Sequence, residues 1–197
     1  MKKYELTDET MIVDGVIYHR IRACKDFDVQ GYHVKAGDLG GYVESECNID
    51  QDGNAWVGGN AMVSGNAIVN GNAIVRGNAW VRGNAWVGGN AIVRGNAEVD
   101  DYARVSGNAI VRGNAEVHKS DHIIVIGPIG SRNDYTTFCR SKDNDIIVKC
   151  GCFNGNISEF LKKVNETHGD NKYAAEYRAA AEIAKIHIDL SEEGEIE

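Results

Sequence analysis

The chain has 197 residues, a formal net charge of −8, and a single proline beside 23 glycines. This acidic balance argues against a general nucleic-acid-binding protein. The sequence contains no run of 18 or more apolar residues and no signal-peptide pattern. We therefore expect a cytoplasmic, turn-rich β protein that does not bind membranes.

The N-terminal segment, residues 1–46, starts with two apolar runs joined by Asp14-Gly15. A two-residue Asp-Gly connection of this kind predicts a β-hairpin. The following stretch, "VKAGDLGGYVESECNIDQDGNAWV", leads directly into a repeat. An open end of a stacked β-structure exposes strand edges and apolar residues, so residues 1–46 are predicted to form a β cap.

A six-residue repeat runs from Gly53 to His118 as eleven hexads of the pattern Gly-Asn-Ala-x-Val-x. One hexad, residues 101–106, departs strongly but keeps its alanine and valine. In each hexad Ala-x-Val alternates as a strand does, while glycine and asparagine tolerate the backbone of a bend. A helix would lose about 1 kcal/mol at every glycine. The repeat over residues 47–118 therefore predicts short strands stacked about 4.8 Å apart.

The spacing of an aliphatic residue and a small one four places on, as in Val75 and Ala79, resembles the hexapeptide-repeat family. That resemblance implies a left-handed parallel β-helix with three hexads in each 18-residue turn. The segment from Asp26 to Asn48, with "VQGYH" as a small insertion, is similar to the start of poorly characterised phage and bacterial proteins that carry the same repeats. The resemblance implies a phage context without an established activity.

Residues 119–190 are predicted to form a small α+β domain. Three strand-like runs, "HIIVIG", "DYTTFCR" and "DIIVKCGCF", indicate a β-meander. Asn156 and Glu159 form the signature of a helix N-terminus, and Gly169 ends that helix. A second helix is expected from about Asn171 to His187, followed by an acidic tail at 191–197. This domain also resembles the C-terminal domain of the phage proteins.

Outward-pointing residues 18 apart should form columns along each face of the coil. One predicted column is apolar, and tryptophans recur on the other two faces; these residues are Trp56, Ile74, Ile92, Ile110, Trp80 and Trp86. Monomers seldom expose contiguous apolar patches, so these residues are predicted to form an oligomer interface. Members of the family are commonly trimers, so the resemblance favours a homotrimer.

Two groups of residues are candidates for binding an anion. The first is a column of arginines, Arg76, Arg94 and Arg112, which repel one another unless an anion or an acidic partner lies across them. A solvated face, an ion pair between subunits and an anionic ligand all remain open for this column. The second is the turn containing Gly130, Ser131 and Arg132, which is either a structural hairpin turn or a backbone nest for an anion.

The five cysteines are interpreted as reduced thiols, since no export signal accompanies them. A site built from Cys139, Cys150 and Cys152 with a histidine does not match the strong zinc patterns, so no metal site is predicted. His168, in "THGDN", is interpreted as part of a helix stop rather than as a working group.

The named enzymes of the hexapeptide family are acyltransferases, whose catalytic histidine lies on a loop projecting from the coil. Every hexad here has six residues, and no histidine precedes His118 within the repeats. The sequence therefore predicts no catalytic residues and no cofactor, and an enzyme is the less favoured interpretation. We expect an oligomeric phage-type binding protein that sequesters a phosphate-bearing, nucleotide-like immune signal. An acyltransferase and a scaffold that binds a host protein remain the alternatives.

Overall fold

The computed structural model describes residues 2–191. The predicted acidic tail lies outside these residues from position 192 onward. The described chain divides into two compact units. The first, here called the solenoid unit, comprises residues 2–114 and 118–120, and the second, the C-terminal unit, comprises residues 115–117 and 121–191.

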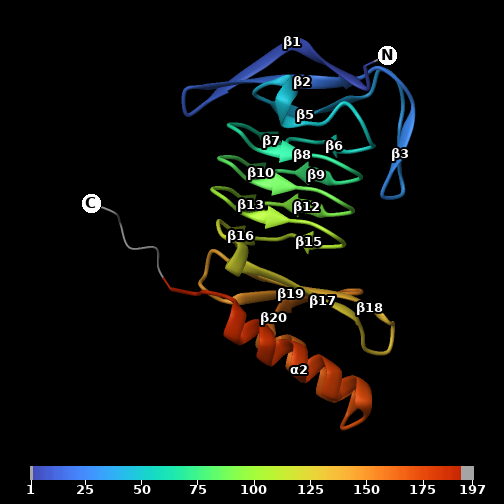
Figure 1. The fold of residues 1–197 in the computed structure, drawn as a ribbon, viewed down its shortest axis with the longest axis vertical. Helices are drawn as coiled ribbons and strands as arrows, with labels where there is room; N and C mark the ends of the chain where they lie inside the picture. The colour runs from blue at the N-terminus through green and yellow to red at the C-terminus, as the bar shows by residue number, and fades with distance from the viewer. Residues whose placement is uncertain (1, 192–197) are drawn as a thin grey trace. The chain divides into compact units, whose positions relative to one another are not determined.

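The solenoid unit is a parallel β-helix, and its coils are stacked as in Figure 1. The first ten hexads contribute one short strand each: β6 (Trp56–Val57), β7 (Met62–Val63), β8 (Ile68–Val69), β9 (Ile74–Gly77), β10 (Trp80–Val81), β11 (Trp86–Val87), β12 (Ile92–Gly95), β13 (Glu98–Val99), β14 (Arg104–Val105) and β15 (Ile110–Val111). Every third strand pairs in parallel, so that Trp86 lies opposite Ile68 and Arg104, each 18 residues away. The predicted β-helix with three hexads per turn is therefore confirmed.

Alanine and valine form the core of the coils. Val75, Val81, Val87 and Val93 are fully buried, and the alanines two places before them are at most 1% exposed. The x residue between them points outward, as the alternation along a strand requires. Trp80 and Trp86 are accordingly only partly buried.

The Gly-Asn pair forms each corner of the coil, and its two residues have different roles. The glycine has positive φ, and a Cβ there would collide with the backbone of the next coil; at Gly89 it would lie 2.9 Å from the nitrogen of Gly107. The asparagine amides hydrogen-bond from coil to coil, as from Asn72 to Asn90 (3.3 Å) and from Asn90 to Asn108 (3.2 Å). Side-chain ladders thus accompany the backbone ladders along the corners.

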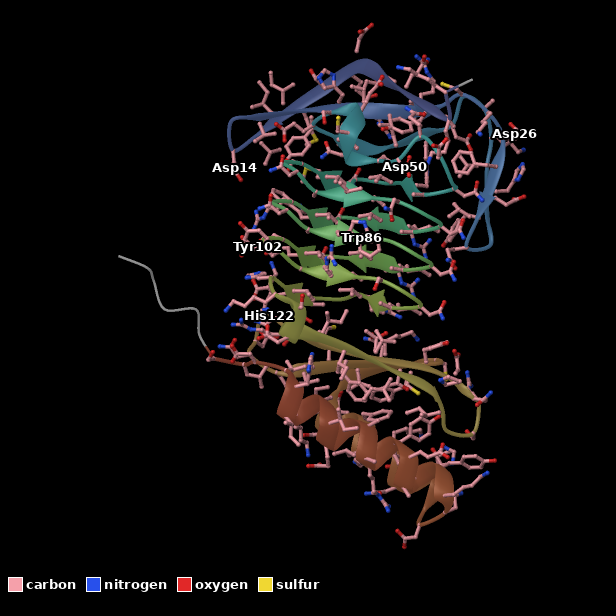
Figure 2. All side chains as sticks on the ribbon, viewed as in Figure 1. Asp14, Asp26, Asp50, Trp86, Tyr102 and His122 are labelled. Carbon is pink, nitrogen blue, oxygen red and sulfur yellow. The ribbon has the colours of Figure 1, made fainter. Side chains whose placement is uncertain are left out.

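The N-terminal cap is a β-hairpin joined to the first coils. β1 (Tyr4–Val13) and β2 (Val16–Ala23) pair antiparallel around Asp14-Gly15, whose φ angles of 50° and 79° suit a tight hairpin turn. Asp14 lies at the tip of this hairpin in Figure 2. β5 (Leu39–Val43) pairs antiparallel with β2 and parallel with β7. This strand therefore joins the antiparallel hairpin to the parallel strands of the solenoid. The 3-10 helix η1 (Glu46–Asn48) follows.

The "VQGYH" insertion forms a second hairpin, β3 (Phe27–Val29) with β4 (Tyr32–Val34). Its turn residues Gln30 and Gly31 both have positive φ. Phe27 packs edge-to-face on Trp56, with ring centroids 5.5 Å apart. This hairpin was not predicted, because Gln-Gly is not one of the usual two-residue turn pairs of hairpins.

The C-terminal unit is an antiparallel meander with two helices. Its elements are β16 (Glu116–Val117), β17 (Ile123–Ile129), β18 (Asp134–Arg140), β19 (Ile146–Cys150), β20 (Phe153–Asn156), α1 (Ile157–His168) and α2 (Lys172–His187), with η2 (Ser120–His122) before β17. The third predicted strand run is two strands, because Gly151 turns the chain with φ of 54°. Asn156 caps α1 with Glu159 reciprocating, and Gly169 ends it, as predicted.

Side chains from the strands and both helices form the core of this unit; they include Phe138, Val148, Phe160, Val164, Tyr177, Ala181 and Ile188. Neither described helix is long and apolar enough to cross a membrane.

Candidate functional site

The arginine column is present where the repeat places it. Arg76 and Arg94 lie opposite each other on the paired strands β9 and β12, and Arg112 follows β15, the next strand of that sheet. All three side chains are half-buried. The 18-residue register is the reason that these arginines form one column.

No carboxylate lies within ion-pair distance of Arg76, Arg94 or Arg112 among residues 2–191, in contrast to Arg20, Arg22 and Arg82 of the same unit. Arg20 and Arg82, for example, pair with Glu9 and Asp100 at 2.8 and 3.1 Å. Burial, and then the charge of Arg94, lower the pKa of Arg76. The Nε atom of Arg94 is buried and has no hydrogen-bond acceptor. The column is therefore an unneutralised line of positive charge.

A groove of about 430 Å³ opens beside the column. We call it the hairpin groove, because Tyr32 and His33 of the β3–β4 hairpin form one wall, while Gly58, Ile74 and Arg76 belong to the other. The Arg76 guanidinium carbon lies 4.4 Å from the centroid of the Tyr32 ring, within the range of a cation–π contact. The groove is lined mainly by apolar groups, and Arg76 and Asp38 add a cation and a carboxylate to the lining.

The predicted interface residues fall into two sets. Trp56 and Ile74 are 8% and 3% exposed, and both line the hairpin groove of the same chain, where Phe27 packs on Trp56. Ile92 and Ile110, further along that column, are half-buried. Trp80 and Trp86 lie on the other two faces, with Arg82 and Arg104 stacked on their rings at 5.4 and 5.7 Å.

The turn that contains Gly130, Ser131 and Arg132 joins β17 to β18 in the C-terminal unit. The backbone N–H of Gly130 donates to Glu176 Oε2 at 2.6 Å. A Cβ at Gly130 would lie 2.0 Å from the Tyr177 hydroxyl oxygen, which explains the glycine. The protein's own carboxylate thus occupies the predicted nest at this N–H, and Arg132 remains as the cationic group of the turn.

Ser131 and Arg132 line a cavity of about 400 Å³, here called the C-terminal pocket. Phe153, Phe160 and Val164 supply apolar walls, and Lys163 and His168 add two nitrogen groups from α1. The His168 ring stacks on Tyr177 with centroids 5.7 Å apart. Burial, and then the Cys150 thiol, raise the pKa of Tyr177, so its hydroxyl stays protonated at neutral pH.

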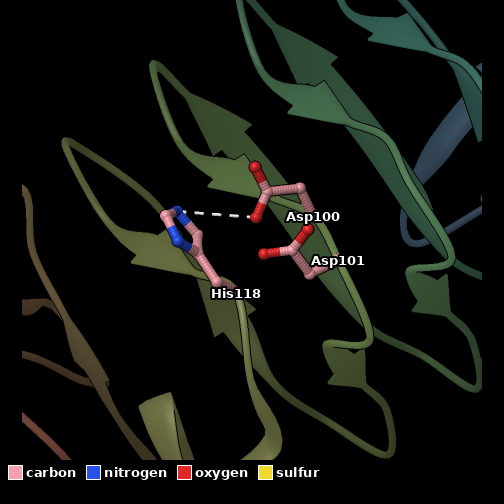
Figure 3. A group of neighbouring side chains, drawn as sticks. All are labelled: Asp100, Asp101 and His118. Atoms are coloured by element: carbon pink, nitrogen blue, oxygen red, sulfur yellow. Dashed lines mark ion pairs between the residues drawn. The ribbon is translucent and has the colours of Figure 1, made fainter. Parts of the chain in front are cut away.

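The cysteines do not form a metal-binding group in the described part of the chain. Cys139 is buried, and burial raises the pKa of its thiol to about 12. Another group does have the composition of a metal site: Asp100, Asp101 and His118, whose ligand atoms lie within 4.8 Å of one another (Figure 3). Asp100 and His118 are 18 residues apart, so the repeat aligns them, whereas Asp101 stands in the irregular hexad and no column pattern predicts its place in the group.

Comparison with known proteins assigns no family. A scan against protein-family models finds no match, and neither does a search of curated proteins.

Proposed function

We propose that this protein binds a small, phosphate-bearing ligand without turning it over, and that the arginine column provides the main charged contacts. The unneutralised column carries the proposal. Three half-buried guanidinium groups without a carboxylate partner repel one another, and a bound anion would relieve that repulsion.

Arginine suits this role because its planar fork contacts two oxygens of a phosphate and keeps its charge at any physiological pH. Coil stacking spaces the guanidinium groups about 4.8 Å apart, so successive phosphates or the several oxygens of one phosphate group can each meet a donor. The buried Nε of Arg94 is a donor that still lacks an acceptor. The adjoining hairpin groove, with Tyr32 and Trp56 in its lining, offers an apolar surface for a base-like part of the ligand.

The resemblance of the repeats and the C-terminal domain to phage proteins extends this proposal. A phage-encoded oligomer with this site would act as a host-defence antagonist that sequesters a nucleotide-like immune signal. A scaffold that binds a host protein, and an acyltransferase, remain the alternatives that the test below separates.

The test is a binding screen by calorimetry with pyrophosphate, ADP-ribose, cyclic dinucleotides and an acyl-CoA. Arg94→Gln should weaken binding of the phosphate ligand by roughly 1.5 to 3 kcal/mol, the range for hydrogen bonds to charged groups, with the fold intact. Arg104→Gln is the matched control, since it removes an equal charge from a different face.

Two results would overturn the proposal. If none of the phosphate ligands binds, or if Arg104→Gln weakens binding as much as Arg94→Gln, the column is not the site. Mass spectrometry of the ligand after incubation decides whether turnover occurs, because a chemically altered ligand would indicate an enzyme.

The C-terminal pocket is a second candidate site for an anion, favoured by Arg132, which has no carboxylate within ion-pair distance in the described structure. Arg132→Gln should weaken binding there, and Lys162→Gln, on the same unit but outside the pocket lining, should not. Comparing these two variants with Arg94→Gln assigns any observed binding to one unit.

A further inference from the structure

Asp100, Asp101 and His118 stand together at one corner of the solenoid unit (Figure 3). Asp100 and His118 occupy equivalent positions of adjacent coils, 18 residues apart, and Asp101 follows Asp100 directly. Asp100 Oδ1 lies 3.5 Å from His118 Nε2. Ligand atoms of all three side chains lie within 4.8 Å of one another.

The Asp100 carboxylate is buried and only one of its two oxygens accepts a hydrogen bond. Asp100 is only 7% exposed, and its Oδ1 atom is buried and accepts no hydrogen bond. Its other oxygen, Oδ2, accepts from Arg82 Nε at 3.1 Å. Burying a carboxylate oxygen without a donor is costly, so Oδ1 faces into the cluster in need of an electropositive partner.

Arg82 contacts this corner from the preceding coil. It pairs with Glu98 at 3.5 Å and with Asp100 Oδ2 at 3.1 Å. The other oxygen of Asp100, Oδ1, lies toward His118.

The sequence places Asp101 here at a conformational cost. Other corners of the coil have glycine at this position, whereas Asp101 adopts a φ of 49° as a non-glycine residue. This is the hexad that departs from the repeat, and its next residue, Tyr102, is 76% exposed at the edge of the coil (Figure 2). The departure supplies a third ligand beside the stacked Asp100 and His118.

We propose that Asp100, Asp101 and His118 bind a divalent transition-metal ion, with Zn²⁺ as the best match, and that this ion links two adjacent coils. Two ligands of a tetrahedral Zn²⁺ ion, with bonds of about 2.0 to 2.1 Å, stand roughly 3.3 Å apart, close to the separation of Asp100 Oδ1 and His118 Nε2. Rotation of the exposed Asp101 side chain brings the third oxygen into range, and water completes the shell.

The donor set argues for this class of metal over Mg²⁺ or Ca²⁺. Those hard ions prefer shells made of oxygen, and Ca²⁺ takes six to eight ligands. An imidazole nitrogen with two carboxylates instead suits Zn²⁺, Mn²⁺ or Co²⁺. The proposal is independent of the anion site, since it involves none of the same residues.

The experiment is a titration of the full-length protein with Co²⁺, a spectroscopic substitute for Zn²⁺, followed by displacement with Zn²⁺. Cobalt distinguishes this site from the five free thiols, because thiolate ligation produces a strong near-ultraviolet charge-transfer band and nitrogen and oxygen ligation does not. We expect one equivalent of Co²⁺ to bind without that band, and a rise in the melting temperature with Zn²⁺.

Asp101→Asn and His118→Gln should each weaken Co²⁺ binding at least about tenfold, as expected when a ligand of a small site is lost. Asn tolerates the positive φ at position 101, so this variant keeps the fold. The matched control is His33→Gln, which removes a histidine paired with the single carboxylate of Asp28 at 2.8 Å in the β3–β4 hairpin.

Three outcomes would overturn the site: no Co²⁺ binding, a thiolate charge-transfer band, or equal loss of affinity in His33→Gln.

Discussion

At the scale of single residues, the solenoid depends on a thin core that consists mainly of buried valine and alanine side chains. Val87 is fully buried between coils, whereas Ile68, which points outward on the preceding coil, is 42% exposed. Both side chains are aliphatic, but the Val87 side chain points into the coil and the Ile68 side chain points out of it. Substitutions at these positions should therefore differ sharply in their cost.

We expect Val87→Asp to destabilise the protein by about 3 to 5 kcal/mol or to leave it insoluble, because the new carboxylate has no partner in an apolar core. Ile68→Asp should cost less than about 1 kcal/mol. Urea denaturation of both variants measures this difference. A soluble Val87→Asp variant with native stability would contradict the inward assignment.

Lys3 provides a pH-dependent prediction. It is fully buried, its Nζ donates to the Asp50 carbonyl, and burial lowers its pKa from 10.5 to about 8. Between these two pH values the unfolded chain binds the proton and the folded chain does not, so the stability of the folded state rises with pH.

The stability of the wild type relative to Lys3→Met should therefore increase by about 2 kcal/mol from pH 7 to pH 9.5. Denaturant melts at both pH values provide the measurement, with Lys35→Met, at an exposed position, as the control. A constant difference across this range would show that Lys3 keeps its charge in the folded state.

At the scale of elements, the corners of the coil explain why glycine recurs at every sixth position. Gly89 and Gly107 share a φ of +64°, but their surroundings differ. A Cβ at Gly89 would meet the backbone of the next coil at 2.9 Å, whereas a Cβ at Gly107 would meet nothing within 4 Å. Substitutions at these two glycines therefore distinguish the cost of backbone strain from the added cost of a steric collision.

Gly107→Ala should cost about 1 kcal/mol, the strain of a left-handed alanine. Gly89→Ala should cost roughly 2 to 4 kcal/mol, since the collision with a neighbouring backbone is added to that strain. Thermal melts of the two variants test the comparison. Equal losses would mean that strain alone holds glycine in the repeat.

At the scale of the whole molecule, the predicted homo-oligomer remains a prediction. Within the apolar column, Trp56 and Ile74 are buried, while Ile92 and Ile110 are half-buried. The column is thus shorter than the sequence indicated. Trp80 and Trp86 add partly exposed rings on the other faces.

Light scattering at micromolar concentration should give a multiple of the 21.5 kDa chain mass, with three copies expected. Ile92→Arg should shift the protein toward the monomer, because it places a charge in the predicted interface. Tyr102→Arg, at a 76% exposed position outside the column, should not. A monomeric wild type would remove any site that requires two subunits.

The sequence by itself determined the repeat, the direction of the alanines and valines within it, the two ends of α1 and the alignment of Arg76 with Arg94. These features follow from local periodicity and from backbone preferences, which depend on neighbouring residues alone. Tertiary structure decided what lies across those columns. The β3–β4 hairpin covers Trp56 and walls a groove beside Arg76, Glu176 reaches the Gly130 turn, and Asp101 joins His118. Such contacts join residues distant in sequence, so no local pattern records them.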